Sequence, residues 1–294
     1  MNLPWHEADK ASLSAAIEAG RLPHALLVSA YPGWGAAALG EWLALKVLAV
    51  PGATEARRLA HPDFRWLAPE KGVIPVDAIR RLRDFSVGAP QMAPGKAVVI
   101  EDADRMNVNA ANALLKTLEE PSSNTYIILT SQRAGTLPPT IRSRCQNVAI
   151  ARNAQAAETW LTDAKARRLL DDYDGAPLLA LAGAEEGERP MAEMLSELSR
   201  GGPERTAALV EEMLALDPAR LSARWARCLV NAMGGATPDL GRAATEWRAA
   251  TDRRTFAFID ELQWFHLQVV VSTSANVRLL LERLCHRWSQ LAVS

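Results

Sequence analysis

The sequence predicts an α/β domain built on a parallel sheet, followed by two all-helical domains. Short apolar runs alternate with helix-like segments up to about residue 150, which is typical of a parallel sheet covered on both faces. After residue 150, segments rich in Ala, Leu, Arg and Glu dominate. After Gly241 the chain contains no further Pro or Gly, and this favours long helices.

In the first half, expected strands and helices follow one another. The expected strands are short apolar runs at His24–Ser29, Phe64–Leu67, Ala97–Ile100 and Tyr126–Thr130. The first expected helix, Ala36–Val50, is stopped by Pro51-Gly52. A second helix carries an apolar stripe at every third residue, namely Val76, Ile79, Leu82 and Phe85. The third helix is expected at Asn107–Glu120, ended by Pro121.

The second half is expected to hold a small helical domain at 151–195 and an all-helical domain at 196–294, after the α/β domain at 1–150. Gly183–Pro190 and Gly201–Pro203 are the candidate linkers. The stripe from Leu279 to Trp288 has the helical period, with arginines beside it. The expected large core side chains of the last domain are Trp247, Phe256, Phe258, Trp264, Phe265 and Trp288.

Composition narrows the function classes. Lys and Arg number 33 against 34 Asp and Glu, a net charge of -1, so any DNA contact must come from a local patch. The cysteines Cys145, Cys228 and Cys285 form no CxxC pair, which suits a reducing compartment. The N-terminal segment does not resemble a signal peptide. The longest apolar run, Ala176–Ala184, is about half a bilayer span. We expect a cytoplasmic protein.

A glycine-rich turn lies between the first strand and its helix, in the layout of a nucleotide phosphate loop. The working pattern G-x-x-x-x-G-K-[ST] uses lysine on the β/γ-phosphates and a hydroxyl on Mg²⁺. Here the turn carries Gly33 and Gly35, but Ala36 and Ala37 replace the lysine and the hydroxyl residue, and Ala30 replaces the first glycine. Taken alone, this could be a strand-to-helix turn that merely needs glycine. We expect no ATP hydrolysis by the chain itself, and ATP binding that is degenerate or absent; weak binding through backbone N–H groups and the helix N-terminus stays open.

Carboxylates follow the strand at Ala97–Ile100, where ligands bind in such sheets. Working ATPases place Asp and then Glu there, whereas this chain has Glu101 and then Asp102. We interpret the pair as vestigial. The alternative is a solvated acidic turn that caps the next helix through Asp104 or Asn107.

Three further motifs follow in order: Asn112-Ala-Leu-Leu-Lys-Thr-Leu-Glu-Glu-Pro121, Ile127-Ile-Leu-Thr-Ser131, and Leu137-Pro-Pro-Thr-Ile-Arg-Ser-Arg-Cys145. Together they resemble the clamp-loader branch of the AAA+ ATPases. The resemblance is strong over residues 1–150 and weaker beyond. It implies a P-loop NTPase-like AAA+ domain, a small helical lid domain and a helical collar domain that holds the subunits of a ring together.

The resemblance also implies a mechanism. In this family ATP binds between neighbouring subunits, and the arginine of a Ser-Arg-Cys motif reaches into the adjacent subunit's site. Here that residue is Arg144, and Arg142 is the weaker candidate. Such an arginine finger in trans is worth about 10³–10⁵ in rate. The alternative is that Arg144 is an ordinary arginine on the protein surface. Ser143 and Cys145 are expected to be structural.

Other family features are absent. Ser131 occupies the place of a sensor residue, but without the lysine we expect no sensing role. Asp174-Gly-Ala-Pro-Leu178 lacks the arginine that active relatives carry, and Pro177 suits a first helical turn. The zinc module of many relatives is also missing, because residues 50–60 contain no cysteine. We expect no zinc and no required cofactor. The histidines His24, His61, His266 and His286 are expected to be structural.

The expected function is that of an ATPase-dead clamp-loader subunit of a bacterial replicative DNA polymerase holoenzyme, itself a nucleotidyltransferase. The implied partners are gamma/tau-type motor subunits, a delta-type wrench subunit, the sliding clamp, and primed DNA through the complex. Arg80, Arg81 and Arg83 are candidate DNA contacts, or else a solvated or salt-bridged helix face. Two rival functions are an autonomous AAA+ ATPase and a stand-alone DNA-binding protein.

Overall fold

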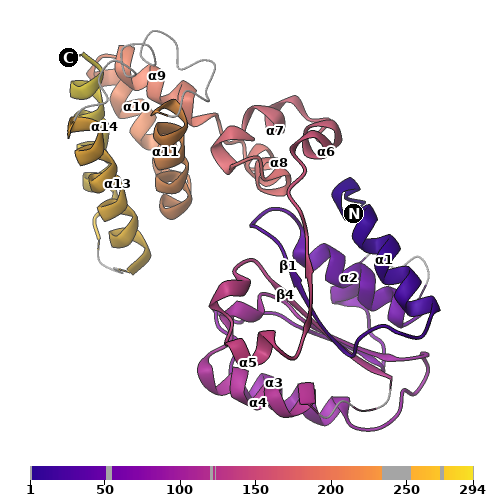
Figure 1. Ribbon diagram of the computed structural model, residues 1–294. Helices are drawn as coiled ribbons and strands as arrows, with labels where there is room; N and C mark the ends of the chain where they lie inside the picture. The colour runs from indigo at the N-terminus through magenta and orange to yellow at the C-terminus, as the bar shows by residue number, and fades with distance from the viewer. Residues whose placement is uncertain are drawn as a thin grey trace. The chain divides into compact units, whose positions relative to one another are not determined.

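The fold is described from a computed structural model of the chain (Figure 1). It describes residues 2–50, 55–119, 122, 124–233, 253–271 and 275–293. The residues Pro51, Gly52, Glu120, Pro121, Gly241 and Trp247 of the sequence analysis lie outside these ranges. The chain separates into two compact units, Met1–Trp160 and Leu161–Ser294. The three-domain division at residues 150 and 195 stays a prediction.

The first unit is built on a five-stranded parallel sheet in the order β2-β3-β4-β1-β5. Its strands are β1 (Ala25–Ser29), β2 (Phe64–Leu67), β3 (Lys96–Ile100), β4 (Thr125–Ser131) and β5 (Gln146–Ala149). The four strands predicted from apolar runs are confirmed to within one residue at either end. Strand β5 was not predicted, because its Gln-Asn-Val-Ala sequence is mostly exposed and carries no apolar run.

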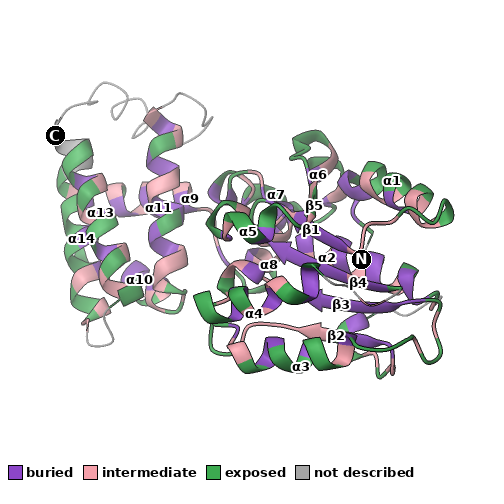
Figure 2. Cartoon of the chain, turned by 60° about the horizontal axis from the view of Figure 1, so that its bottom comes forward, coloured by how far each residue is buried: buried purple, intermediate pink, exposed green. Residues whose placement is uncertain are grey.

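Helices cover both faces of this sheet, with α1 (Glu7–Glu18) and α2 (Ala36–Val47) on one side and α3 (Val76–Ser86) and α4 (Val108–Glu119) on the other (Figure 1). The buried strands lie between them (Figure 2). Ile79 and Leu82 of α3 and Leu114 of α4 belong to one core cluster with strand residues. The α/β class predicted from the sequence is confirmed.

Local chemistry explains where the helices begin and end. Helix α2 ends at Val47 rather than Val50, because Ala49 adopts a left-handed φ of 52°. Gly40 lets α2 approach the sheet: a Cβ there would lie 2.7 Å from Thr130 Cγ2. The remaining elements of this unit are α5 (Pro139–Arg142), α6 (Ala154–Trp160) and short 3-10 turns at Pro4–His6, Ala56–Arg58, Ala103–Arg105 and Ala134–Thr136.

The second unit is helical over its described residues, as predicted. Its helices are α7 (Ala164–Arg168), α8 (Pro177–Glu185), α9 (Met191–Arg200), α10 (Pro203–Leu214), α11 (Pro218–Met233), α13 (Arg253–Val271) and α14 (Val277–Val293), with a 3-10 turn at Asp171–Tyr173. Gly183 lies inside α8, so the first candidate linker is confined to the residues that follow this helix.

Three aromatic rings form the centre of the helical core. Trp225, Phe258 and Trp288 are buried, with ring centroids 5.5 to 6.1 Å apart. The predictions of Phe258, Phe265 and Trp288 as core residues are confirmed. The predictions of Phe256 and Trp264 are wrong, because these side chains are 54% and 44% exposed on the opposite face of α13.

Among the described helices, none combines the length and apolar character that a membrane span requires.

The Asp63 carboxylate fixes the chain segment that leads into β3. It is fully buried and accepts hydrogen bonds from the backbone N–H groups of Gln91 (2.7 Å), Met92 (2.7 Å) and Ala93 (2.9 Å). Burial by itself would raise the pKa of Asp63, but these three donors together hold that pKa below its ordinary value of 3.8. The charged carboxylate therefore stabilises the fold.

We expect Asp63→Asn to lower the free energy of unfolding by about 2–3 kcal/mol at pH 7, because a charged acceptor of three buried donors is lost. A carboxyl whose folded pKa is depressed contributes stability above its unfolded pKa and loses it as pH falls through the folded pKa. The gap between wild type and variant should therefore close below about pH 4. Urea denaturation at several pH values measures it, and a gap independent of pH would contradict this account.

Candidate nucleotide loop and arginine site

The candidate phosphate loop connects β1 to α2 and is covered by the N-terminal segment of the chain. Gly33 and Gly35 adopt left-handed φ values of 79° and 82°, which glycine tolerates without strain. A Cβ at Gly35 would lie 2.7 Å from Leu3 Cδ1 and 3.1 Å from His6 Cε1. Both side chains are buried, so the chain's own residues are packed against the glycine of this loop.

Trp34, in the middle of the loop, is held by the same segment. Its carbonyl oxygen lies 3.0 Å from Trp5 Nε1, which donates to it, and 2.9 Å from His6 Nε2. The ring of Trp5 makes edge contacts with the rings of Trp34 and Trp160, each with centroids 5.4 Å apart. Trp160 Nε1 in turn donates to the carbonyl of Asn2 at 3.0 Å. Burial lowers the pKa of His6, which favours the neutral ring.

This cluster of Trp5, Trp34 and Trp160 was missed by sequence reasoning. Its members are far apart along the chain and follow no helical or strand period. The one available signal was a bulky tryptophan between the two glycines of a phosphate loop.

The two acidic residues that follow β3, Glu101 and Asp102, form contacts with different side chains. The Glu101 carboxylate accepts a hydrogen bond from Trp66 Nε1 at 3.0 Å and forms an ion pair with Arg57. Asp102 has a left-handed φ of 46° and accepts from Gln132 Nε2 at 3.2 Å. Among the described residues, no group of three or more His, Cys, Asp or Glu is placed to hold a metal ion. The vestigial character of the pair stays a prediction.

Ser131 is fully buried at the end of β4, and its hydroxyl is already engaged. Its Oγ donates to Asp104 Oδ1 at 2.8 Å and accepts from the backbone N–H of Arg133 at 3.1 Å. Asp104 also pairs with the Arg133 guanidinium. Of the two expected caps of helix α4, Asp104 and Asn107, the structure shows Asn107: its Oδ1 accepts a hydrogen bond from the backbone N–H of Ala110 at 2.8 Å.

Arg144 lies just after α5, with its side chain 35% exposed. Its Nε donates to Glu119 Oε1 at 2.8 Å, its Nη2 pairs with the same oxygen, and its Nη1 donates to the carbonyl of Thr140 at 3.0 Å. Ser143 Oγ donates to the same Thr140 carbonyl at 3.2 Å. Burial raises the pKa of the neighbouring Cys145 to about 11, so its thiol stays protonated. Arg142 is exposed on the same segment.

The arginines of α3 have local partners. Arg80 pairs with Asp77 at 3.0 Å and Arg83 with Asp84 at 3.5 Å, both on the same helix. Arg81 is exposed. A salt-bridged or solvated helix face accounts for these contacts, and a DNA contact stays a prediction.

The histidines that were predicted to be structural each lie within hydrogen-bond distance of a neighbour. The partners are the carbonyl of Leu118 for His24, the backbone N–H of Asp63 for His61, Ser222 Oγ for His266 and Gln290 Nε2 for His286. Pro177 opens α8, as its position in the sequence predicted.

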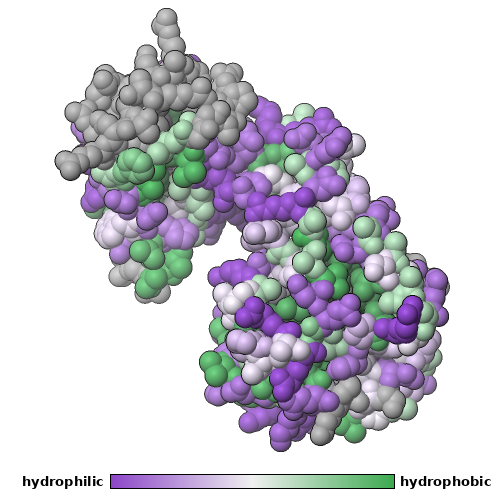
Figure 3. Space-filling view, in the orientation of Figure 1, coloured by the Kyte–Doolittle hydropathy of each residue, from purple (hydrophilic) through white to green (hydrophobic). Residues whose placement is uncertain are grey.

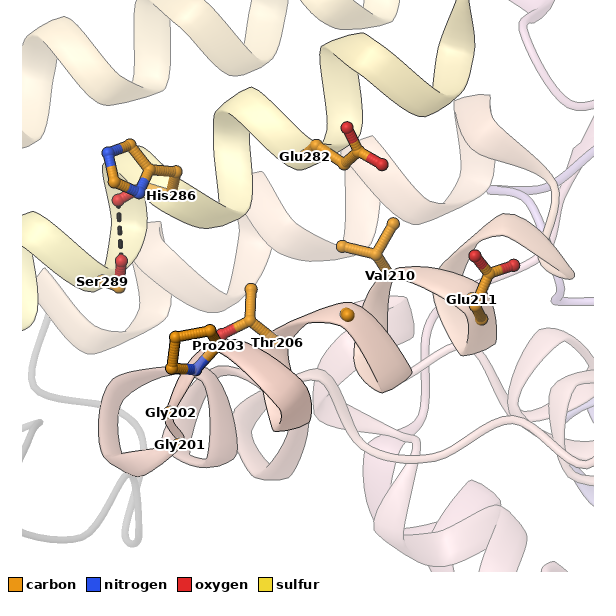
Figure 4. A pocket seen from close by; sticks show the side chains of 10 residues that line it. Gly201, Gly202, Pro203, Thr206, Val210, Glu211, Glu282, His286 and Ser289 are labelled. Atoms are coloured by element: carbon orange, nitrogen blue, oxygen red, sulfur yellow. Dashed lines mark hydrogen bonds between the residues drawn. The ribbon is translucent and has the colours of Figure 1, made fainter.

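In the part of the chain that the structure describes, two of the hollows lie outside the nucleotide loop. One, of about 390 Å³, opens between α10 and α14, where Thr206 and Val210 face Glu282 and His286 (Figure 4). Ser289 Oγ donates to the carbonyl of His286 at its end. The other, of about 430 Å³, is lined by Arg57, His61, Arg65, Trp66 and their neighbours. Neither contains a nucleophile paired with a base.

Comparison with known proteins identifies the family. A family model described as "DNA polymerase III, delta subunit" matches residues 5–154. The chain is 40% identical to the DNA polymerase III subunit delta' of Pseudomonas aeruginosa over 196 residues, 61% of this chain and 58% of that protein. It is 37% identical to the Escherichia coli subunit delta' over 173 residues, 54% of this chain and 52% of that protein. The chain thus spans little more than half the length of these relatives.

A solved structure supports the fold. A DNA polymerase III gamma subunit-related protein from Thermotoga maritima superposes with a TM-score of 0.55 at 17% identity, covering 95% of this chain and 99% of that one. Within the clamp-loader branch, a lost phosphate-loop lysine beside a retained Ser-Arg-Cys motif predicts the delta' subunit, and the comparisons confirm this. Matched over half its length, the chain belongs to the DNA polymerase III delta subunit family, and the two relatives compared above are delta' subunits.

Proposed function

We propose that this chain is a clamp-loader subunit without an ATPase of its own, which completes the ATP site of an adjacent motor subunit with Arg144. The observation that carries the proposal is a contrast within one domain. The nucleotide loop is packed with the chain's own side chains, whereas the guanidinium of Arg144 remains partly exposed in the Ser-Arg-Cys motif.

The nucleotide loop lacks the charge that ATP requires, and Trp34 and Gly35 are packed against the N-terminal segment of the chain. Ala36 and Ala37 supply neither a cation for the phosphates nor a ligand for Mg²⁺. Trp34 is 2% exposed, and its carbonyl is engaged by two buried side chains of the N-terminal segment. Opening this loop would expose the ring of Trp5 and leave buried donors unpaired. Autonomous ATPase activity is therefore disfavoured for two independent reasons.

We expect the isolated chain to show no ATP binding in equilibrium dialysis at about 1 mM Mg-ATP, a concentration at which even a weak site would fill appreciably. The variant Ala36→Lys with Ala37→Thr should behave in the same way, because it restores the phosphate-loop residues and leaves Trp5 and Trp34 in place. Binding by this variant alone would show that the missing lysine, rather than the packed loop, abolishes the site. Binding by the wild type would contradict the inference that the loop is closed to ATP, and ATP hydrolysis by the isolated wild type would contradict the proposal.

Two features support the arginine-finger role of Arg144: the chemistry of the guanidinium group and the sequence motif in which Arg144 stands. A guanidinium is always charged and presents a planar fork of donors that suits phosphate oxygens. Arg144 stands within the complete Leu137-to-Cys145 motif, and hydrogen bonds from Arg144 and Ser143 to the carbonyl of Thr140 hold that motif in shape. Ala36 and Ala37 give the phosphate loop neither the lysine nor the hydroxyl that ATP hydrolysis uses, so the site that Arg144 serves would belong to another subunit.

The experiment that tests the proposal uses a clamp loader rebuilt from this chain with motor and wrench subunits. The clamp- and primed-DNA-stimulated ATPase rate is compared for wild type, Arg144→Ala and Arg142→Ala. A large loss confined to Arg144→Ala in an intact assembly would support the proposal. An unchanged rate would leave this chain only a scaffold.

Assembly with partners is supported by exposed apolar surface on the helical unit. Along one face of α13, large side chains are exposed where a lone monomer would favour polar residues: Phe256, Trp264, Leu267, Val270 and Val271. Apolar surface gathers where α13 ends (Figure 3). Aromatic and aliphatic residues of this kind are typical of subunit interfaces. We infer that motor and wrench subunits cover this face, and that clamp and primed DNA are contacted by the assembled complex.

A further inference from the structure

Glu119 is the group that fixes the direction of the Arg144 side chain. It binds the guanidinium along the edge formed by Nε and Nη2, while the carbonyl of Thr140 takes one hydrogen of Nη1. A guanidinium has five N–H donors. The remaining hydrogens of the two terminal nitrogens have no acceptor among these contacts, and the side chain of Arg144 is 35% exposed. The contact with Glu119 therefore orients the fork and leaves donors for a further acceptor.

Both groups that bind the Arg144 guanidinium lie next to residues buried in the core. Glu119 ends α4 directly after Leu118, which is 2% exposed. Thr140 precedes Ile141, which is fully buried in the same core cluster as Leu118. Arg144 is thus held from two sides by elements packed on one core. A long, flexible arginine would otherwise sample many rotamers. The conformational entropy lost on ordering its side chain would then oppose the reaction when ATP binds.

We propose that Glu119 is a positioning residue, which pre-orients Arg144 for the phosphate oxygens of a nucleotide bound to the neighbouring subunit. The proposal rests on the arginine-finger role proposed above. On this proposal Glu119 acts only through the guanidinium and does not itself bind the nucleotide. Supporting groups of this kind raise activity by holding the group that acts within a narrow range of positions.

A purely structural role for the ion pair predicts different behaviour. Partly exposed ion pairs add little to folding stability, and the side chain of Glu119 is 45% exposed. Glu119→Gln should accordingly leave the thermal midpoint and the assembly of the complex unchanged. Any loss of rate in this variant would then report on the placement of Arg144.

The experiment measures ATPase kinetics of the reconstituted complex with clamp and primed DNA. Glu119→Gln should lower kcat on the order of tenfold, as is typical when a supporting hydrogen-bond partner is removed. KM for ATP should stay unchanged within about twofold, because Glu119 does not contact the nucleotide. Glu119→Asp, which keeps the charge on a shorter stem, should recover part of the rate. Glu18→Gln, at the exposed end of α1, is the matched control for loss of one charge.

A double-mutant cycle separates the possible outcomes. If Glu119 acts through Arg144, adding Glu119→Gln to Arg144→Ala costs nothing further. A further loss in that background would show a structural role and overturn the proposal. An unchanged or raised rate for Glu119→Gln, with Arg144→Ala still severely impaired, would overturn the positioning role alone. If Arg144→Ala itself keeps full activity, the proposed function fails and the positioning role fails with it.

Discussion

Replacing Arg144 by alanine is expected to lower the clamp- and DNA-stimulated ATPase rate of the assembled complex by about 10³-fold. The physical reason is electrostatic. Negative charge builds on the γ-phosphate oxygens during phosphoryl transfer, and a fixed cation at that place stabilises the transition state more than the ground state. Truncation to alanine removes the cation and leaves no group that could replace it. We expect the loss in kcat rather than in KM for ATP.

Matched variants show whether the effect belongs to this side chain. Arg142→Ala removes the same charge from an exposed side chain two residues earlier, at the end of α5, and should leave the rate within about twofold. Arg144→Lys keeps a point charge but loses the planar fork, so it should restore only a minor part of the rate. Size-exclusion chromatography must show intact complexes for every variant. Full activity of Arg144→Ala in an intact complex would rule out the arginine finger.

The outline of this fold could be predicted from the sequence because its strands are short apolar runs. Residues 127–129 and Ala97–Ile100 are buried, and no polar residue interrupts either run. The motif residues Arg144 and Ser131 were found because they stand in contiguous sequence patterns. Long helices were predictable beyond residue 250, where neither Pro nor Gly interrupts the chain.

The contacts that decide how these motifs behave were not predictable, because they join residues far apart in the chain. Trp5 meets Trp34 across 29 positions, and Glu119 meets Arg144 across 25. Neither pair follows a helical or strand period. Trp264 was predicted wrongly for another reason. A large aromatic residue in an apolar helix suggested a core position, but helical geometry places it on the exposed face of α13.

A buried ion cluster holds the helical unit together. Arg224 of α11, 2% exposed, pairs with Asp172 at 2.7 Å and with Glu188 at 2.9 Å. Asp172 also accepts from the backbone N–H of Met191 at 2.8 Å, and Glu188 accepts from the Tyr173 hydroxyl. One guanidinium thereby connects the turn at 171–173, the start of α9 and the middle of α11.

Arg224→Met is expected to lower the free energy of unfolding by about 3–5 kcal/mol at neutral pH, because it leaves the buried Asp172 without its counter-charge and leaves Glu188 only the longer contact with Arg220, at 3.5 Å. Methionine keeps most of the side-chain volume, so loss of packing contributes little. Arg227→Met is the matched control on the same helix: Arg227 is 39% exposed and pairs with the exposed Asp174 at 2.9 Å, and its loss should cost about 1 kcal/mol or less. Urea denaturation followed by circular dichroism measures both.

The pH dependence identifies the cause of the loss. Burial already raises the pKa of Asp172, while Arg224 opposes that shift, so removing Arg224 should raise the pKa further. A carboxyl whose folded pKa exceeds its unfolded value destabilises the fold above that pKa, and the penalty fades as pH falls and the group takes up a proton. The deficit of Arg224→Met should thus shrink from about pH 8 toward pH 5. A deficit that is constant with pH would point to altered packing around Trp225 instead, because packing does not titrate.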